Sequence, residues 1–154
     1  MSAYELVKAL HIVSAAVIFG TGLGTAFMVW RAERGGEVAA IAFATHHAVT
    51  ADWLFTTPAV IFQPLSGAWL IWQGGYDPGE AWLVWSLGLY LLAGLCWLPV
   101  VRLQLRMRDL AQAATAAGAP LPAEYRRLMT VWTRLGWPAF LAVLAIFWLM
   151  VAKP

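Results

Sequence analysis

The stretch Leu6–Trp30 reads LVKALHIVSAAVIFGTGLGTAFMVW, and it decides the fold of this chain. A helix of about 20 apolar residues crosses the roughly 30 Å of hydrocarbon in a bilayer, and this stretch is long enough to do so. Its only ionisable side chains are Lys8 and His11. Because lipid offers no hydrogen-bond partners to free backbone groups, we expect a membrane-spanning helix here.

The rest of the chain has the same apolar character. Hydrophobic residues make up 62% of its 154 residues and charged residues only 12%, with a mean hydropathy of +0.70. A soluble domain of this size cannot bury so much apolar surface. Three further apolar stretches follow the first: Trp53–Trp72, Trp82–Val101 and Leu135–Ala152. We therefore predict an all-α fold in which residues 1–154 form one domain, a polytopic up-down four-helix transmembrane bundle.

The segments between the predicted spans are helical in pattern as well. Glu37–Asp52 is rich in alanine and is expected to extend the second span as a helix. The third span is expected to continue through Arg102–Ala117 until Gly118–Pro122 breaks the helix. Ala123–Thr133 then leads into the fourth span. The sequence thus predicts cytoplasmic helical extensions of the bundle.

Basic residues predict the orientation in the membrane. Lys8 and Lys153 lie on one side, and the other eight of the ten basic residues lie on the opposite side. These eight are Arg31, Arg34, Arg102, Arg106, Arg108, Arg126, Arg127 and Arg134. Cytoplasmic connections are rich in Lys and Arg. We therefore predict a multi-pass protein of a bacterial inner (plasma) membrane, with both termini outside, on the periplasmic side.

The charge of the chain also bears on its partners. The net charge is +2, and the basic residues cluster beside the spans. This pattern is explained by membrane topology and favours anionic lipid at the cytoplasmic face as a partner. It predicts no nucleic-acid partner.

Several function classes find no support in the sequence. The chain has one cysteine, Cys96, so no disulfide can form within it. It has no phosphate-binding loop, no nucleophile triad, no CxxC pair and no pair of acidic catalytic residues. Hydrolytic and nucleotide-driven functions are therefore not expected.

Half of the tryptophans fall where the predicted spans end. They are Trp30, Trp53, Trp72, Trp82 and Trp132, out of ten in the chain. Amphipathic rings at headgroup depth have this distribution. We therefore expect these five side chains at the membrane interfaces, and the deeper tryptophans in packing contacts or beside a ligand.

The first span carries the strongest candidate for a functional site. At about 100° per residue, Lys8 and Gly22 lie on the same side of the helix as His11. A charge at the centre of a span costs roughly 2.5–3.5 kcal/mol, so intramembrane ionisable residues mark candidate sites. Neutral imidazole is a common haem ligand, which makes His11 a candidate metal ligand for haem b or another porphyrin. The alternative, equally compatible with the pattern, is that His11 bonds a neighbouring helix while Lys8 reaches the headgroups.

Two further residues complete the candidate cofactor site. The second span contains Pro58 and Pro64, and each leaves a backbone carbonyl one turn earlier without its usual partner. Together with the Gln63 amide they predict a bent, polar wall, which either lines the pocket of His11 or only shapes the bundle. Arg134 is expected to bind a propionate or a lipid phosphate, or simply to reach the headgroups.

The adjacent pair His46 and His47 is not expected to share the ligand of His11. Neighbouring residues on a helix point about 100° apart, so the two rings cannot face one metal ion. His11 also lies roughly 28 Å from the inner end of its span. We therefore expect His46 and His47 to be solvated or interfacial.

Several short motifs resemble the HemJ-type protoporphyrinogen oxidases, small four-span membrane proteins of haem synthesis. They are Tyr4 with Lys8-Ala9-Leu10-His11-Ile12-Val13, Thr56-Thr57-Pro58-Ala59-Val60, Gly67-Ala68-Trp69-Leu70 and Val151-Ala152-Lys153-Pro154. The resemblance implies a shared scaffold and porphyrin or haem binding. That family usually has two histidines and a lysine in its third span, where this chain has Val84, Ser86 and Trp97. The oxidase activity therefore does not carry over with the scaffold.

A closer resemblance is to a family of predicted bacterial integral membrane proteins with no assigned function. The shared patterns are Leu10-His11-Ile12 and Ala51-Asp52-Trp53.

Two hypotheses of different class follow. In the first, the protein binds haem b through His11 and serves a redox role. In the second it is a non-enzymatic membrane subunit or homo-oligomer, assembled through the small-residue ridge of Ala16, Gly20 and Gly24. The ridge is also compatible with packing inside the bundle. A small transporter is a weaker third hypothesis, because no acidic residue lies within a predicted span to couple a cation.

Overall fold

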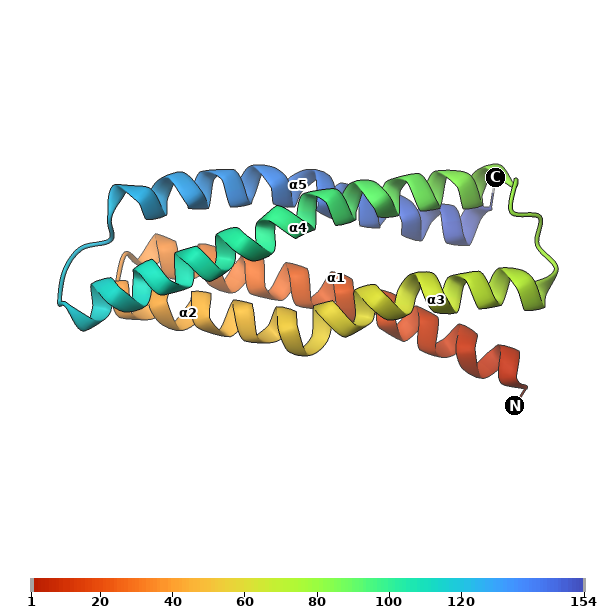
Figure 1. Cartoon of the computed structure of the whole chain (residues 1–154), viewed down its shortest axis with the longest axis horizontal. Helices are drawn as coiled ribbons and strands as arrows, with labels where there is room; N and C mark the ends of the chain where they lie inside the picture. The colour runs from red at the N-terminus through yellow and green to blue at the C-terminus, as the bar shows by residue number, and fades with distance from the viewer. Residues whose placement is uncertain (1, 154) are drawn as a thin grey trace.

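The computed structural model describes residues 2–153, so that Met1 and Pro154 of the predicted domain lie outside the described residues. Four helical rods lie along one axis (Figure 1). The elements are α1 (Ala3–Gly35), α2 (Val38–Ala51), η1 (Asp52–Thr56), α3 (Thr57–Gly74), α4 (Ala81–Ala116) and α5 (Ala123–Ala152). The elements α2, η1 and α3 form one continuous rod, in which η1 is a π-helical turn.

The described residues are all helix and connections, with no strand among residues 2–153. Each of the four rods is long and apolar enough to cross a membrane. The predicted all-α four-helix membrane bundle is therefore confirmed. The helical extensions are confirmed too, since α4 runs unbroken to Ala116 and α5 begins at Ala123.

The bundle has two distinct ends (Figure 1). Both chain ends and the α3–α4 connection lie at one of them, which we call the termini end. The α1–α2 and α4–α5 connections lie at the other, which we call the arginine end because Arg31, Arg34, Arg126 and Arg127 are near it in the chain. This up-down arrangement agrees with the predicted topology.

Local sequence signals set the limits of α1. The Ser2 hydroxyl accepts from the Glu5 backbone N–H at 3.2 Å, and the Glu5 carboxylate accepts from the Ser2 N–H at 2.8 Å. This reciprocal capping box satisfies two backbone donors that begin the helix. At the other limit Gly36 has a φ of 72°, a left-handed conformation that glycine adopts without strain. The chain can therefore turn at once into α2.

The best-packed core lies toward the arginine end. One cluster joins Ile41 of α2, Met107 and Ala111 of α4, and Tyr125 of α5. A second cluster is formed by Val29, Ala44 and Ala48. By contrast, only 11% of the most apolar window of α1 and 6% of that of α5 is buried inside the chain. The spanning segments therefore turn most of their apolar surface outward, as lipid-facing helices do.

The two halves of the bundle separate toward the termini end (Figure 1). No Cα atom of α3 lies within 8 Å of a Cα atom of α4 along their described lengths. One side-chain hydrogen bond bridges them, from the Tyr90 hydroxyl to the Val60 carbonyl. This carbonyl is the one that Pro64 leaves free, because proline has no N–H to donate to the residue four positions earlier. The free carbonyl expected from the sequence is thus used to join α3 to α4.

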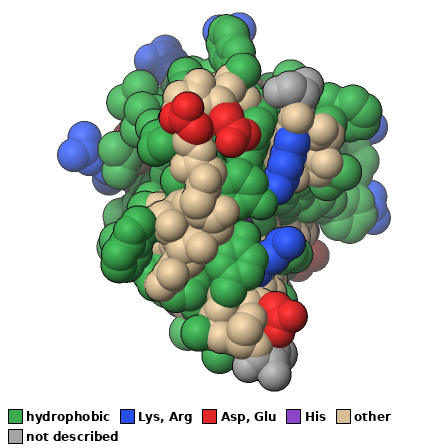
Figure 2. Space-filling view, turned by 90° about the vertical axis from the view of Figure 1, so that its right-hand side faces the viewer, with side chains coloured by type: hydrophobic (Ala, Val, Ile, Leu, Met, Phe, Trp, Pro, Cys, Tyr) green, Lys and Arg blue, Asp and Glu red, His purple; other side chains and the backbone are tan. Residues whose placement is uncertain are grey.

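Side chains also close the termini end itself. Lys153 donates to the Tyr76 hydroxyl at 3.0 Å and lies 5.1 Å from the centre of the Trp82 ring. The hydrogen bond from the Lys153 ammonium group lowers the pKa of Tyr76. Figure 2 shows this end, with basic side chains near the middle of the face and acidic side chains on either side. Trp82, in the first turn of α4, is buried here and packs against Tyr76.

Candidate functional site

His11 lies in the first third of α1 and faces α3. Its Nδ1 atom is 2.7 Å from the Ser66 hydroxyl oxygen. A side chain on the next residue, Gly67, would place a Cβ 3.4 Å from the His11 ring. This is an ordinary van der Waals distance, so the imidazole lies close against the backbone of α3.

The Ser66 hydroxyl lies within hydrogen-bond distance of three polar atoms. Its oxygen is 2.7 Å from His11 Nδ1, 2.8 Å from the Phe62 carbonyl oxygen and 3.2 Å from the Gln63 carbonyl oxygen. A hydroxyl has one proton, so when it donates to a carbonyl of α3 it accepts from His11 Nδ1–H, and the imidazole lone pair is then on Nε2. Metal-bound histidines have this arrangement, in which the nitrogen that does not bind the metal donates to a neighbouring oxygen.

Gln63 lies beside the same residue but not against its ring. Its amide nitrogen donates to the His11 backbone carbonyl at 3.2 Å, and its Oε1 atom is buried without a hydrogen-bond partner. The structure therefore brings His11 and Gln63 together, as their polar character within the spans suggested. Ser66 was missed by the sequence analysis. Its signal was the spacing of three residues from Gln63, which places both on one face of a helix.

The other predicted site residues lie elsewhere. Lys8 is exposed, one turn from His11 toward the termini end. Gly22 lies eleven residues further along α1 than His11, which corresponds to roughly 16 Å. Arg134 is exposed in the half of α5 nearer the arginine end. The structure places neither Gly22 nor Arg134 beside the imidazole.

His46 and His47 are both exposed on α2. The His46 ring lies 3.3 Å from the amide of Gln112, and the His47 ring packs against Phe43. Their exposure agrees with the expectation that these rings are solvated or interfacial. Among residues 2–153, no group of three His, Cys, Asp or Glu side chains is placed to hold a metal ion.

A second polar cluster lies nearer the arginine end, and the sequence analysis did not single it out. The Asp52 carboxyl group is buried in η1 and accepts from the Thr56 hydroxyl at 2.8 Å. The buried Gln104 side chain of α4 lies near it. Neither of the ion pairs between described residues, Arg106–Glu124 and Arg108–Asp109, involves Asp52. The i, i+4 spacing of Asp52 and Thr56 was the available signal.

The small-residue ridge of α1 does not pack inside the bundle. A Cβ built on Gly20 or Gly24 meets no atom within 4 Å. Both glycines line an open groove of about 430 Å³ between α1 and the α2–η1 segment, with Thr50 and Leu54 on its other side. The interpretation of this ridge as a packing face within the chain is therefore wrong, because α2 stays too far from the glycines to use them.

Comparison with known proteins gives the family of the chain. No curated protein and no solved structure matches it. A family model described as "Predicted integral membrane protein (DUF2269)" matches residues 5–154, which is nearly the whole chain. The four apolar rods of the structure agree with that description. This chain therefore belongs to the DUF2269 family of predicted integral membrane proteins.

Proposed function

We propose that this membrane protein binds haem b, or a related porphyrin, through His11 and serves a redox role. The observation that carries the proposal is the 2.7 Å hydrogen bond between His11 Nδ1 and Ser66. With the imidazole proton on Nδ1, this bond leaves the Nε2 lone pair free, and Nε2 makes no hydrogen bond within the described residues. An intramembrane imidazole held in this state is suited to axial ligation of iron.

Each residue has a distinct part in the proposed site. Ser66 holds the imidazole in the ligating tautomer, and Gln63 fixes the backbone of the same helical turn. Lys8 is exposed one turn away and can pair with a propionate. A bound haem supplies one-electron chemistry. Gly22 and Arg134 lie outside this site. The proposal includes a bacterial inner membrane with the termini end outside, as the distribution of arginine favours.

Absorption spectra test the proposal. We expect the protein, purified in detergent after expression with added haem precursor, to show a Soret band that shifts on reduction with dithionite. His11→Ala is expected to lose the band, because the iron loses its ligand. The double variant His46→Ala/His47→Ala is the matched control and is expected to keep it. A wild-type protein without a Soret band, or a band unchanged by His11→Ala, contradicts the proposal.

The open ridge of α1 favours a second candidate function, a homo-oligomeric membrane subunit. Gly20 and Gly24 present bare backbone on the surface of a predicted span. Such ridges let a helix of a second copy approach closely. Lipid can also cover this groove, so the measurement has to distinguish a dimer of the protein from a monomer covered by lipid.

The oligomer is tested by a bulky side chain on the ridge. We expect native mass spectrometry to show a dimer of the wild type and at least a tenfold weaker dimer of Gly20→Leu, since leucine holds the helices apart. Gly88→Leu is the control, because Gly88 is also exposed and free of neighbours but lies on α4. A monomeric wild type, or equal effects of both variants, argues against this candidate.

A further inference from the structure

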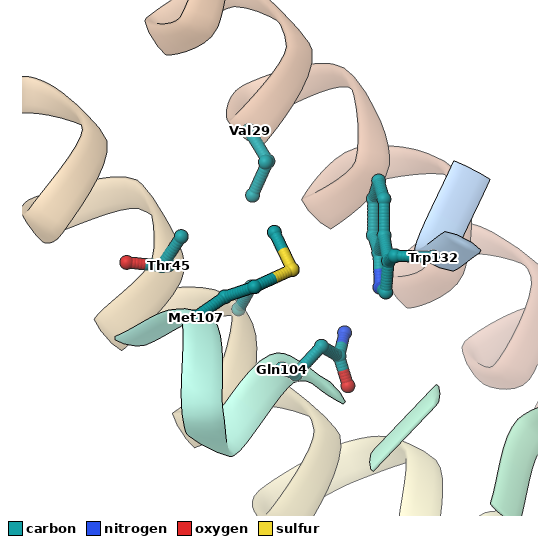
Figure 3. A pocket seen from close by; sticks show the side chains of 6 residues that line it. Val29, Thr45, Gln104, Met107 and Trp132 are labelled. Atoms are coloured by element: carbon teal, nitrogen blue, oxygen red, sulfur yellow. The ribbon is translucent and has the colours of Figure 1, made fainter. Parts of the chain in front are cut away.

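A small, partly open cavity lies where four helices meet, toward the arginine end. Its volume is about 10 Å³. The walls come from Val29 of α1, Thr45 and Ala48 of α2, Gln104 and Met107 of α4, and Trp132 of α5. Figure 3 shows these side chains converging on one space, with the Met107 thioether near its centre. The cavity is separate from the site of His11 and from the groove of the glycine ridge.

One polar atom in this wall has no partner. The Trp132 Nε1 atom is buried and makes no hydrogen bond to any described residue. In Figure 3 the indole nitrogen lies on the side of the ring that faces the Gln104 amide. A buried N–H without an acceptor is costly, and native structures rarely leave one unpaired. Something that accepts a hydrogen bond is therefore expected in the cavity.

Size and polarity restrict the occupant. A volume of about 10 Å³ is about one probe sphere, close to the smallest space that holds a water molecule. A cation does not fit the chemistry, because the Trp132 N–H presents its positive end to the space. An apolar guest would leave the donor unpaired. Water alone satisfies both restrictions.

We propose that this cavity is a binding site for a single water molecule, which accepts from Trp132 Nε1 and bonds to the Gln104 amide. The water thus joins a donor on α5 to a side chain of α4, in the part of the bundle where the best-packed core lies.

The indole protons provide a direct test. The protein is labelled with ¹⁵N only at its ten tryptophans, and magnetisation transfer from water to each indole proton is measured in nanodiscs. The Trp132 resonance is assigned by its loss in Trp132→Phe. We expect it to show a cross-peak to a bound, slowly exchanging water molecule. Trp97 is the internal control, because its Nε1 atom is also buried without a partner but does not line the cavity.

The variant Gln104→Leu tests the second contact of the water. It removes the amide while keeping a side chain of similar size, and the Trp132 cross-peak is expected to fall to the level of Trp97. A wild-type Trp132 signal no stronger than that of Trp97 overturns the proposal, and this comparison needs no variant that alters folding. A strong cross-peak that survives Gln104→Leu overturns the role of Gln104 in binding the water.

Discussion

Replacing Tyr125 with alanine is expected to lower the free energy of unfolding by about 3–5 kcal/mol, as for other large buried aromatic residues. Tyr125 is 0% exposed and packs with Ile41, Met107 and Ala111 in the larger core cluster. Alanine leaves a cavity there that helices fixed by their own hydrogen bonds cannot refill. The change is measured by denaturant unfolding in detergent micelles, followed by circular dichroism.

Two control variants separate packing from other effects. Tyr125→Phe keeps the buried ring and is expected to cost clearly less than Tyr125→Ala, because it removes only the hydroxyl group, which lies near the Glu33 carboxylate. Trp148→Ala removes a larger ring, but Trp148 is 70% exposed on a predicted lipid-facing surface. We expect it to cost far less than Tyr125→Ala. Equal losses for Trp148→Ala and Tyr125→Ala would show that the core is not concentrated at the arginine end.

Tyr90→Phe is expected to destabilise the bundle by about 1–3 kcal/mol, because a half-buried carbonyl within a span loses its hydrogen-bond partner. The Tyr90 hydroxyl is the donor to the Val60 carbonyl and bridges α3 to α4. Pro64 cannot supply the N–H that would otherwise bond this carbonyl. The same unfolding experiment in micelles measures the loss.

A double-mutant cycle with Pro64→Ala tests whether the unpaired Val60 carbonyl causes the loss of stability in Tyr90→Phe. Alanine at position 64 restores a backbone N–H that can bond to the Val60 carbonyl within the helix. Tyr90→Phe is then expected to cost clearly less in the Pro64→Ala background than in the wild type, because the carbonyl keeps a partner. The same cost in both backgrounds would mean that the Tyr90 hydroxyl stabilises the protein by some other contact.

The helices could be predicted well from the sequence because a membrane leaves few alternative backbone conformations to an apolar segment. Each long apolar stretch has to satisfy its backbone internally, and only a helix does so within one segment. The extensions followed from local signals as well: Gly118–Pro122 ends one helix, and α5 begins at Ala123 as predicted. The surroundings of the tryptophans at the span boundaries were not predicted: Trp30, Trp53 and Trp72 are exposed, whereas Trp82 is buried by the tertiary structure.

The candidate site was only partly visible in the sequence. His11 and Gln63 attracted attention because a polar residue is unusual within a span, and the structure brings them together. Ser66 did not, because serine is common in such helices and only its bond to His11 gives it a role. Asp52 was taken as the last residue of an alanine-rich extension. In the structure it is buried, and its carboxyl group accepts from the Thr56 hydroxyl.

The order of apolar and polar residues along the chain determined by itself that this protein is a bundle of four membrane helices, since each span is stabilised by bonds within its own segment. The faces that those helices turn toward one another were decided only by the tertiary structure. Helix faces differ little in hydrophobicity when lipid is the solvent, so packing and single hydrogen bonds select the contacts. For that reason His11 meets Ser66, Trp132 lines a cavity and the glycines of α1 remain open.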